Sequence, residues 1–340
     1  MSIRYVGGRV ASALITIALL ILINFVLFRA MPGAPERIAA GRHPGVTAET
    51  FANIRERWGL DKPVYPISIV GEPPFVEINP ENQFARYIAS TLTGDLGVAF
   101  SGAGQSVAEM IGAAIGPTLL LFGLGELIAI FAGLALGAYT GWRRGGAVDY
   151  VGNGVSLVLY SMPYFLIGMI MLLIFATTLG WFPTFGMTTP GEQFASPLDQ
   201  LLDLLSHLVL PVATVAIGLI GQYSILMRSS VIETLGEDYV TTARAKGLRD
   251  NRILRKHAFP NALLPAVTLI AINLGYVVAG AITVEVVFNW PGLGTLTVEA
   301  LEARDFPLLQ GIFLLLSVAV VFANLGADFI YGYLDPRVRT

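Results

Sequence analysis

The sequence contains no cysteine, and only 13% of its 340 residues are charged. Without cysteine the chain has no disulfide framework, no thiolate metal site and no cysteine nucleophile. The nucleotide-binding pattern G-x-x-x-x-G-K-[ST] is absent, so the chain does not bind ATP through such a loop. Neither G-x-S-x-G nor H-E-x-x-H occurs, and His43, His207 and His257 lack metal-ligand spacing. We therefore predict no catalytic residue and no metal site, and we do not expect an enzyme.

Hydrophobic residues make up 54% of the chain, and they gather in six long runs. The runs are Val10–Phe28, Thr118–Gly141, Tyr150–Leu179, Leu208–Met227, Ala262–Val284 and Leu308–Ala327. Each is about 19 residues or longer, enough for a helix to cross the ~30 Å hydrocarbon layer. Helix is the expected form because no water is available there to bond the backbone. The sequence predicts an all-α polytopic membrane protein with six transmembrane helices, bent at Pro163 and Pro211.

Lysine and arginine are distributed unevenly between the two sides of such a protein. With the N-terminus inside, the cytoplasmic segments hold 13 of these residues, and the two short outer loops hold one, Arg304. An excess of this kind in short loops marks the cytoplasmic side. We therefore expect both the N- and the C-terminus in the cytoplasm. The first run is predicted to be a retained anchor, because Met31, Pro32 and Gly33 follow it instead of a small-residue cleavage site.

The runs divide the chain into three predicted parts. These are residues 1–30, the cytoplasmic N-terminus and first transmembrane helix; 31–115, an extracytoplasmic insertion; and 116–340, a five-helix core with a cytoplasmic loop at 228–260. In the insertion, Phe51, Ile54 and Trp58 have the spacing of an amphipathic helix. The stretch TGDLGVAF lies further along the insertion, and its glycines predict turns.

The densest cluster of charge lies in the stretch EDYVTTARAKGLRDNRILRKHAFPNALLP, in which nine of 29 residues are charged. Asp238 is a good N-cap, no helix breaker follows as far as Lys246, and Gly247 suits the position after the helix. This pattern predicts a helix of about two turns, roughly 12 Å long. Asp250 is predicted to cap a second helix that ends at Pro260. A simple positive-inside loop explains the charge of the stretch but not these helix signals.

Several stretches resemble one family of membrane proteins, in the same order along the chain. They are FRAMPGAP after the first run, GDLGVAF, GWFPTFGM, DYVTTARAKGLRDNRILRKHAFPNALLP, VEVVFNWPGLGTLTVEALEARDFPLLQG and the C-terminal YGYLDPRVR. The family comprises the membrane (permease) subunits of ATP-binding-cassette importers, and the resemblance is closest to its dipeptide, oligopeptide and nickel group. The long segment after the first run resembles the B-type subunit of that group. The resemblance implies the type I ABC importer fold.

The resemblance also implies that the short cytoplasmic helix is a coupling helix, which sits in a groove of an ATPase subunit. The implied docking residues are Asp238, Tyr239, Val240, Thr241, Thr242, Ala243, Arg244, Ala245, Lys246 and Gly247. The leading Glu-Ala-Ala of the family's EAA signature aligns with Thr241, Thr242 and Ala243, so the glutamate is missing from this chain. The later Ile-x-Leu-Pro element of the signature falls imperfectly at 257–260.

On the outer side, the resemblance implies an outer gate and a docking surface for a binding protein at Trp290, Pro291, Gly292 and Gly294. The alternative there is an ordinary loop that Trp290 anchors at the membrane interface. The implied partners are a second, homologous permease subunit, two ATP-binding cassette ATPase subunits, an extracytoplasmic substrate-binding protein and the lipid membrane, but no nucleic acid. ATP and Mg are implied to bind to the ATPase subunits, so this chain itself needs no cofactor.

Together these features predict the permease subunit of an ATP-driven importer of di- or oligopeptides, spanning the cell membrane several times. The alternative is a proton-coupled secondary transporter that uses Glu126, the only charged residue in the six runs. A structural role for Glu126, in a helix interface beside Gly123 and Gly125, is the favoured interpretation. Glu285 and Asp328 lie at the ends of runs, where water is near, so their positions alone indicate little about function. The substrate stays open among dipeptides, oligopeptides, glutathione, nickel chelates and haem.

Overall fold

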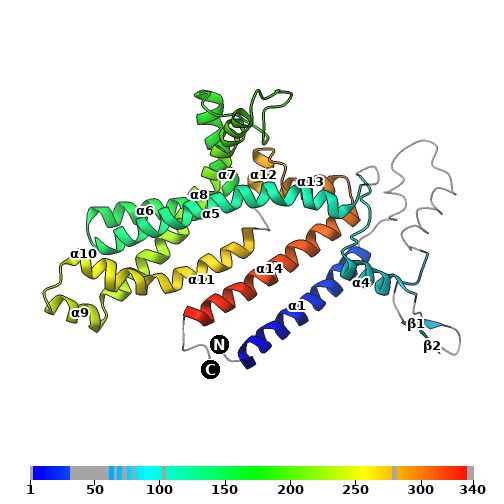
Figure 1. Cartoon of the computed structure of the whole chain (residues 1–340), viewed down its shortest axis with the longest axis horizontal. Coiled ribbons are helices and arrows are strands. Elements are labelled where there is room, and N and C mark those ends of the chain that lie inside the picture. Colours follow the sequence, from blue (N-terminus) through cyan, green and yellow to red (C-terminus); the bar gives the residue numbers. More distant parts are fainter. Residues whose placement is uncertain are drawn as a thin grey trace. The chain divides into compact units, whose positions relative to one another are not determined.

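The computed structural model describes residues 3–30, 61–64, 67–70, 75–78, 81–101, 105–277 and 282–334. The chain falls into two compact units. The first unit comprises Met1–Ala13, Ile115–Thr295 and Ala319–Thr340, and the second comprises Leu14–Ala114 and Leu296–Val318. The described part of each is built mainly of helices (Figure 1). The helix predicted around Phe51, Ile54 and Trp58 lies outside the described residues.

Five stretches of helix in this part of the chain are long and apolar enough to cross a membrane. They lie in α1 (Ile3–Ala30), α5 (Val107–Trp142), α8 (Pro197–Leu235), η2 with α11 (Leu254–Ala258 and Phe259–Val277) and α14 (Phe306–Leu334). A bent series of α6 (Ala147–Ser161), α7 (Tyr164–Met171) and η1 (Leu172–Thr178) makes a sixth span if its parts are counted as one. The predicted helical architecture, with a helix for each apolar run, is therefore confirmed.

The sixth span is broken just before Pro163. Met162 and Pro163 have extended backbone torsions, with ψ angles of 130° and 138°, and the helices on either side differ in direction by 101°. The proline ring disfavours helical torsions in the residue that precedes it. The bend predicted at Pro163 is thus a complete break, and α7 leaves the direction of α6 in Figure 1. By contrast, α8 continues through Pro211 as one helix of 39 residues.

Shorter elements connect the spans. They are β1 (Ile67–Val70), β2 (Phe75–Ile78), α4 (Gln83–Thr93), α9 (Asp238–Ala245), α10 (Asp250–Ile253), α12 (Ile282–Val287) and α13 (Leu293–Glu302). The two strands pair antiparallel, with Ile67 opposite Ile78. Within the described residues this hairpin is the one sheet, beside a single bridge between Val98 and Ser106. The strands lie in the predicted insertion, and the spans are entirely helical.

In the first unit, α5 packs so closely against α8 that several α5 positions have room only for glycine. The glycines concerned are Gly125, Gly133, Gly137 and Gly141. A Cβ atom added at Gly133 would lie 2.6 Å from Tyr223 Cβ, and one at Gly141 would lie 2.8 Å from the backbone oxygen of Arg228. Such approaches are typical of membrane helices, which associate through close packing because lipid tails are as apolar as the side chains. The two helix backbones therefore lie almost in contact.

The helix α6 packs along α8 in the same unit. A Cβ atom added at Gly221 of α8 would lie 2.7 Å from the backbone nitrogen of Tyr160 on α6. Between the two helices, the buried hydroxyl of Ser156 donates a hydrogen bond to Ser224 Oγ at 2.8 Å. Because α8 is in close contact with both α5 and α6, the three helices form a tightly packed block.

In the second unit, α4 begins and ends with recognisable capping residues. The Asn82 side chain accepts a hydrogen bond from the N–H of Ala85, and Gly94 ends the helix with φ +78°. Gly97 has φ +81°, so the turns predicted for TGDLGVAF are confirmed. The hydroxyl of Tyr87 on α4 donates to Asn24 Oδ1 on α1 at 3.1 Å. Asn24 is buried away from water, so this hydrogen bond gives its side-chain oxygen the partner that water would otherwise supply.

The orientation predicted from lysine and arginine can be tested with single cysteines, since the chain has none of its own. Thr93 on α4 and Ala147 at the start of α6 are both exposed. We expect Thr93→Cys to react with a membrane-impermeant maleimide in cells whose membrane is intact. We expect Ala147→Cys to react only after the membrane is permeabilised. The opposite pattern of labelling would overturn the orientation.

Candidate functional site

The predicted cytoplasmic helix is present as α9, Asp238–Ala245. Glu237, not Asp238, occupies the N-cap and makes no side-chain capping bond, so the predicted capping role of Asp238 is wrong. Asp238 lies in the first turn instead, where its charge is favourable to the helix dipole. Gly247 has φ +72°, and its N–H donates to the carbonyl of Arg244 at 2.9 Å. The predicted left-handed glycine after the helix is therefore confirmed.

One face of α9 is buried in its own chain. Val240 is 0% exposed and Ala243 is 5% exposed, and both pack with the buried Ile253 of α10. Three partly buried residues complete this anchoring cluster: Trp142, Leu235 and Leu248. Trp142 is the last residue of α5, so the cluster connects α9 to the end of that span. Val240 and Ala243 therefore hold α9 in place and do not lie on its free surface.

The other face of α9 is open to solvent. The exposed residues are Asp238, Tyr239, Thr241, Thr242, Arg244, Ala245, Lys246 and Gly247. At 3.6 residues per turn, Asp238 and Ala245 lie opposite the buried pair of Val240 and Ala243. Partial burial, together with the nearby charge of Glu237, raises the pKa of Tyr239, so its hydroxyl stays neutral. Eight of the ten implied docking residues are thus available to a partner.

The second predicted helix does not end at Pro260. The chain continues from α10 through the π-helical η2 into α11, which runs to Val277. Proline lacks a backbone N–H and cannot make the usual bond to the carbonyl four residues earlier. The wider π turn just before it, in which the Phe259 N–H reaches Leu254 O, lets the helix pass this position. The cluster that anchors α9 is thereby continuous with the span α11.

At the other end of the first unit, Glu285 forms the centre of a buried polar cluster. Glu285 is 0% exposed, which corrects the expectation that it lies near water. Thr118 Oγ1 on α5 donates to Glu285 Oε1 at 2.6 Å, and the N–H of Gly294 donates to Oε2 at 2.6 Å. Thr118 Oγ1 also accepts the N–H of Leu293 at 2.8 Å. Side chains from two other helices thus cap the start of α13, whose first N–H groups lack partners within the helix.

Three of the four residues implied in an outer gate belong to this cluster. Trp290, Gly292 and Gly294 are buried, and Pro291 is exposed. The Trp290 indole N–H donates to the carbonyl of Pro117 at 2.9 Å, so the ring is held inside the chain and not at its surface. A Cβ atom at Gly292 would lie 2.5 Å from Glu285 Oε2. A larger side chain at Gly292 or Gly294 would collide with the Glu285 carboxylate, so both positions require glycine. Of the four residues, Pro291 alone is open to solvent.

Glu126 has partners that the sequence did not reveal. It is 2% exposed and accepts a hydrogen bond from the hydroxyl of Tyr223 on α8. Asn273 of α11 donates in turn to the same hydroxyl at 3.0 Å. The three side chains therefore join α5, α8 and α11 in the middle of the spans. This arrangement fits the structural interpretation of Glu126 as part of a helix interface.

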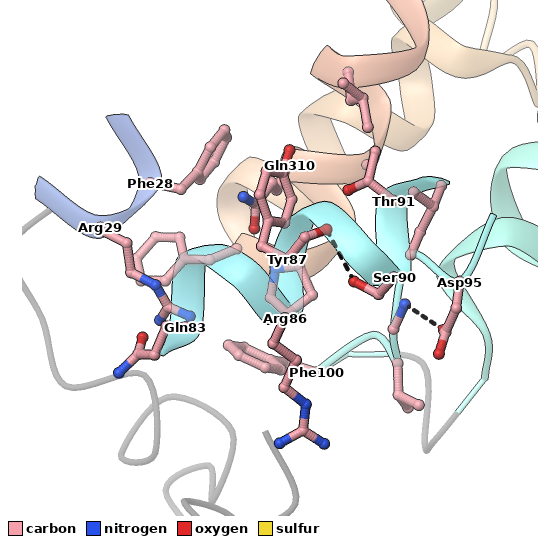
Figure 2. A pocket seen from close by; sticks show the side chains of 17 residues that line it. Phe28, Arg29, Gln83, Arg86, Tyr87, Ser90, Thr91, Asp95, Phe100 and Gln310 are labelled. Carbon is pink, nitrogen blue, oxygen red and sulfur yellow. Dashed lines mark hydrogen bonds between the residues drawn. The ribbon is translucent and has the colours of Figure 1, made fainter. Parts of the chain in front are cut away.

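The second unit contains a cavity of about 240 Å³ between the end of α1, α4 and the start of α14. Figure 2 shows Arg29, Arg86 and Asp95 among the residues that line it. Ser90 Oγ donates to the carbonyl of Tyr87 at 3.1 Å on its wall. None of the residues implied in coupling or gating lines this cavity. Among the residues that the structure describes, no group of three His, Cys, Asp or Glu side chains could hold a metal ion.

Comparison with known proteins gives one consistent result. Residues 133–340 match the family described as binding-protein-dependent transport system inner membrane component, and 2–68 match the N-terminal domain of such components. The glutathione transport system permease protein GsiC of Salmonella paratyphi A is 32% identical, over 99% of this chain and 99% of its own. The oligopeptide transport system permease protein AppB of Bacillus subtilis (strain 168) is 30% identical, over 94% of this chain and 93% of its own.

Among solved structures, a chain of the MetNI methionine ABC transporter in inward-facing conformations is similar in fold. The TM-score is 0.54 at 16% sequence identity, and the match covers 66% of this chain and 96% of the other. At this level of identity the likeness concerns the arrangement of helices alone. It supports the fold implied by the sequence.

Removal of the Thr118 hydroxyl tests the polar cluster around Glu285. Thr118→Val keeps the shape of the side chain but removes the hydroxyl that donates to Glu285 Oε1 and accepts the Leu293 N–H, and the loss of a buried hydrogen-bond partner costs about 1–3 kcal/mol. We expect a lower thermal unfolding midpoint for the purified protein in detergent. Thr140→Val, in the same helix, is the control because the Thr140 hydroxyl donates only to carbonyls of its own helix. Equal midpoints for the two variants would show that the cluster contributes no stability.

Proposed function

The chain belongs to the family of binding-protein-dependent transport system inner membrane components, and on that premise we propose that it is the B-type permease subunit of an ATP-driven peptide importer. It is a multi-pass protein of the cell (inner) membrane. The peptide substrate is supported by full-length relatives named for oligopeptide and glutathione transport. Glutathione is itself a small peptide, so both names point to the same class of substrate.

The proposed complex contains four kinds of subunit. This chain pairs with a second, homologous permease in the lipid membrane, two ATPase subunits bind on the cytoplasmic side, and a substrate-binding protein docks outside. ATP and Mg belong to the ATPase subunits, since this sequence has no nucleotide-binding loop. The extracytoplasmic part at 31–115 and the exposed Pro291 are proposed to face the binding protein. The family membership supports an ATPase and a binding protein as partners, and the copy numbers are part of the proposal.

The observation that carries the coupling proposal is the division of α9 into an anchored and an open face. Val240 and Ala243 fix the helix to the chain's own core, while its remaining residues are exposed. A helix held in this way moves as one piece with the spans behind it. Closure of the ATPase pair on binding ATP would then shift α9 and, through it, the balance between inward-open and outward-open states.

The alternative, a proton-coupled transporter that uses Glu126, has weaker support. Proton relays in transporters use ionisable residues that line a cavity or pathway. Glu126 is buried and bonded to Tyr223, and the described residues around it belong to packed helices. The family is also one of binding-protein-dependent systems. We therefore assign Glu126 to the packing of α5 against α8 and α11.

A bulky residue on the open face of α9 tests docking separately from folding. Ala245→Trp adds a large side chain at an exposed position opposite the anchoring cluster, so the spans should still insert. We expect normal membrane levels, reduced co-purification of the ATPase subunits and little transport. Arg143→Ala is the control, because this cation is exposed, lies over the Tyr139 ring of α5 and does not belong to α9. Unchanged co-purification and transport in Ala245→Trp would refute docking at this face.

Reconstitution of the complete complex into proteoliposomes tests the transport reaction itself. With the binding protein outside and ATP inside, we expect uptake of labelled di- or oligopeptide, and none when ATP is replaced by a proton gradient. Competition by unlabelled dipeptide, pentapeptide, glutathione, nickel chelate and haem would identify the substrate class. Uptake that a gradient drives without ATP would favour the alternative through Glu126. Competition by haem or nickel chelate alone would refute the peptide as substrate but leave the role in an ATP-driven importer standing.

A further inference from the structure

A partly buried ion pair joins α6 to α8 at the end of the spans that leads to α9. Arg228 Nε donates to Asp149 Oδ1 at 2.6 Å, and Arg228 Nη2 donates to Oδ2 at 3.0 Å. The N–H of Gly145, in the loop between α5 and α6, also donates to Oδ2 at 2.9 Å. The side chain of Asp149 is 4% exposed and that of Arg228 is 25% exposed. The carboxylate thus has three donors from two elements and is nearly sealed from water.

The fork geometry of this pair fixes both distance and direction. A guanidinium that bonds both oxygens of one carboxylate holds its partner in a single orientation, which a lysine ammonium does not do. A buried pair of this kind adds little net stability over an apolar substitute, but removal of one partner leaves an unpaired charge. The strongest effect expected of Asp149 and Arg228 is therefore on the placement of α6 relative to α8.

The pair lies where three helices meet. The backbone oxygen of Arg228 lies against Gly141 of α5, where an added Cβ would come within 2.8 Å of it. The next residue of α5 is Trp142, which packs in the cluster that anchors α9. Leu235, seven residues after Arg228 on α8, packs in the same cluster. The cluster thus connects α9 to α5 through Trp142 and to α8 through Leu235, whereas the first turn of α6 is joined to α8 through Asp149.

We propose that Asp149 and Arg228 are positioning residues for energy coupling, which fasten α6 to α8 so that displacement of α9 moves α5, α6 and α8 as one block. This proposal rests on the proposed function of α9 as the helix that receives motion from the ATPase. The start of α6 follows a loop that contains Gly145 at φ +80° and Gly146. Without the pair, the cytoplasmic end of α6 would be held to α8 by packing alone, and we expect α6 to follow the motion of α8 less completely.

The test measures coupling, in the complete complex reconstituted with its ATPase subunits and binding protein. Asp149→Asn keeps the size of the side chain and an oxygen for the Gly145 N–H but removes the charge that holds Arg228. Arg228→Lys keeps the charge but lacks the planar pair of N–H donors that fixes the direction of the carboxylate. We expect each variant to retain membrane level and ATPase co-purification while the peptide transported per ATP hydrolysed falls about tenfold, within the range that single residues of a coupling network produce.

Three comparisons make the outcome decisive. Arg143→Ala removes an exposed cation from the same loop and should leave the ratio of transport to hydrolysis at the wild-type value. A merely structural role would lower the amount of complex, transport and hydrolysis in proportion, with the ratio unchanged, and would overturn the proposal. An unchanged ratio in Asp149→Asn at normal complex levels would overturn it too. Failure of the proposed function would appear differently, as absence of ATP-dependent uptake in the wild-type complex.

Discussion

Where α5 crosses α8, the absence of side chains on one edge of α5 lets two helix backbones approach almost to contact. Lipid tails give apolar helices no reason to associate, so the attraction must come from close packing and from the few polar groups that packing encloses. Gly133 lies on Tyr223, and Gly141 lies on the backbone of Arg228. These same α8 residues carry the side chains that bond Glu126 and Asp149. The glycine contacts therefore fix the positions at which the buried carboxylates can find partners.

Among the residues that the structure describes, the first unit contains three buried carboxylates, and each joins two or more elements. Asp149 bonds Arg228 at one end, Glu126 bonds Tyr223 within the spans, and Glu285 bonds Thr118 and the start of α13 at the other end. An unpaired carboxylate in such surroundings would cost several kcal/mol, roughly the stability of a small domain. Each pair therefore discriminates strongly against a helix that slides or rotates out of register.

Much of the fold could be predicted from the sequence because it depends on local properties. A run of about 20 apolar residues must be a helix in lipid, and Pro163 disfavours helix in the residue before it. Gly247 likewise predicted the end of α9, because glycine readily adopts the positive φ that the chain has at this position. The partners of the carboxylates could not be predicted, since Thr118 and Glu285 are 167 residues apart and Glu126 and Tyr223 are 97 apart. Glu285 in particular sits at the end of an apolar run, and only the return of the chain through α13 excludes water from it.

The buried face of α9 gives a physical reason for part of the family's signature and changes its interpretation. The position that aligns with the last alanine of Glu-Ala-Ala is Ala243, which packs against Ile253 inside the chain. A small residue is needed there for the helix to lie close to its own core, whatever binds on the other side. The position of the missing glutamate is Thr241, which is exposed. The docking that we propose for α9 therefore cannot depend on an acid at position 241, and we expect the contact to come from the shape of the open face and from the cations Arg244 and Lys246.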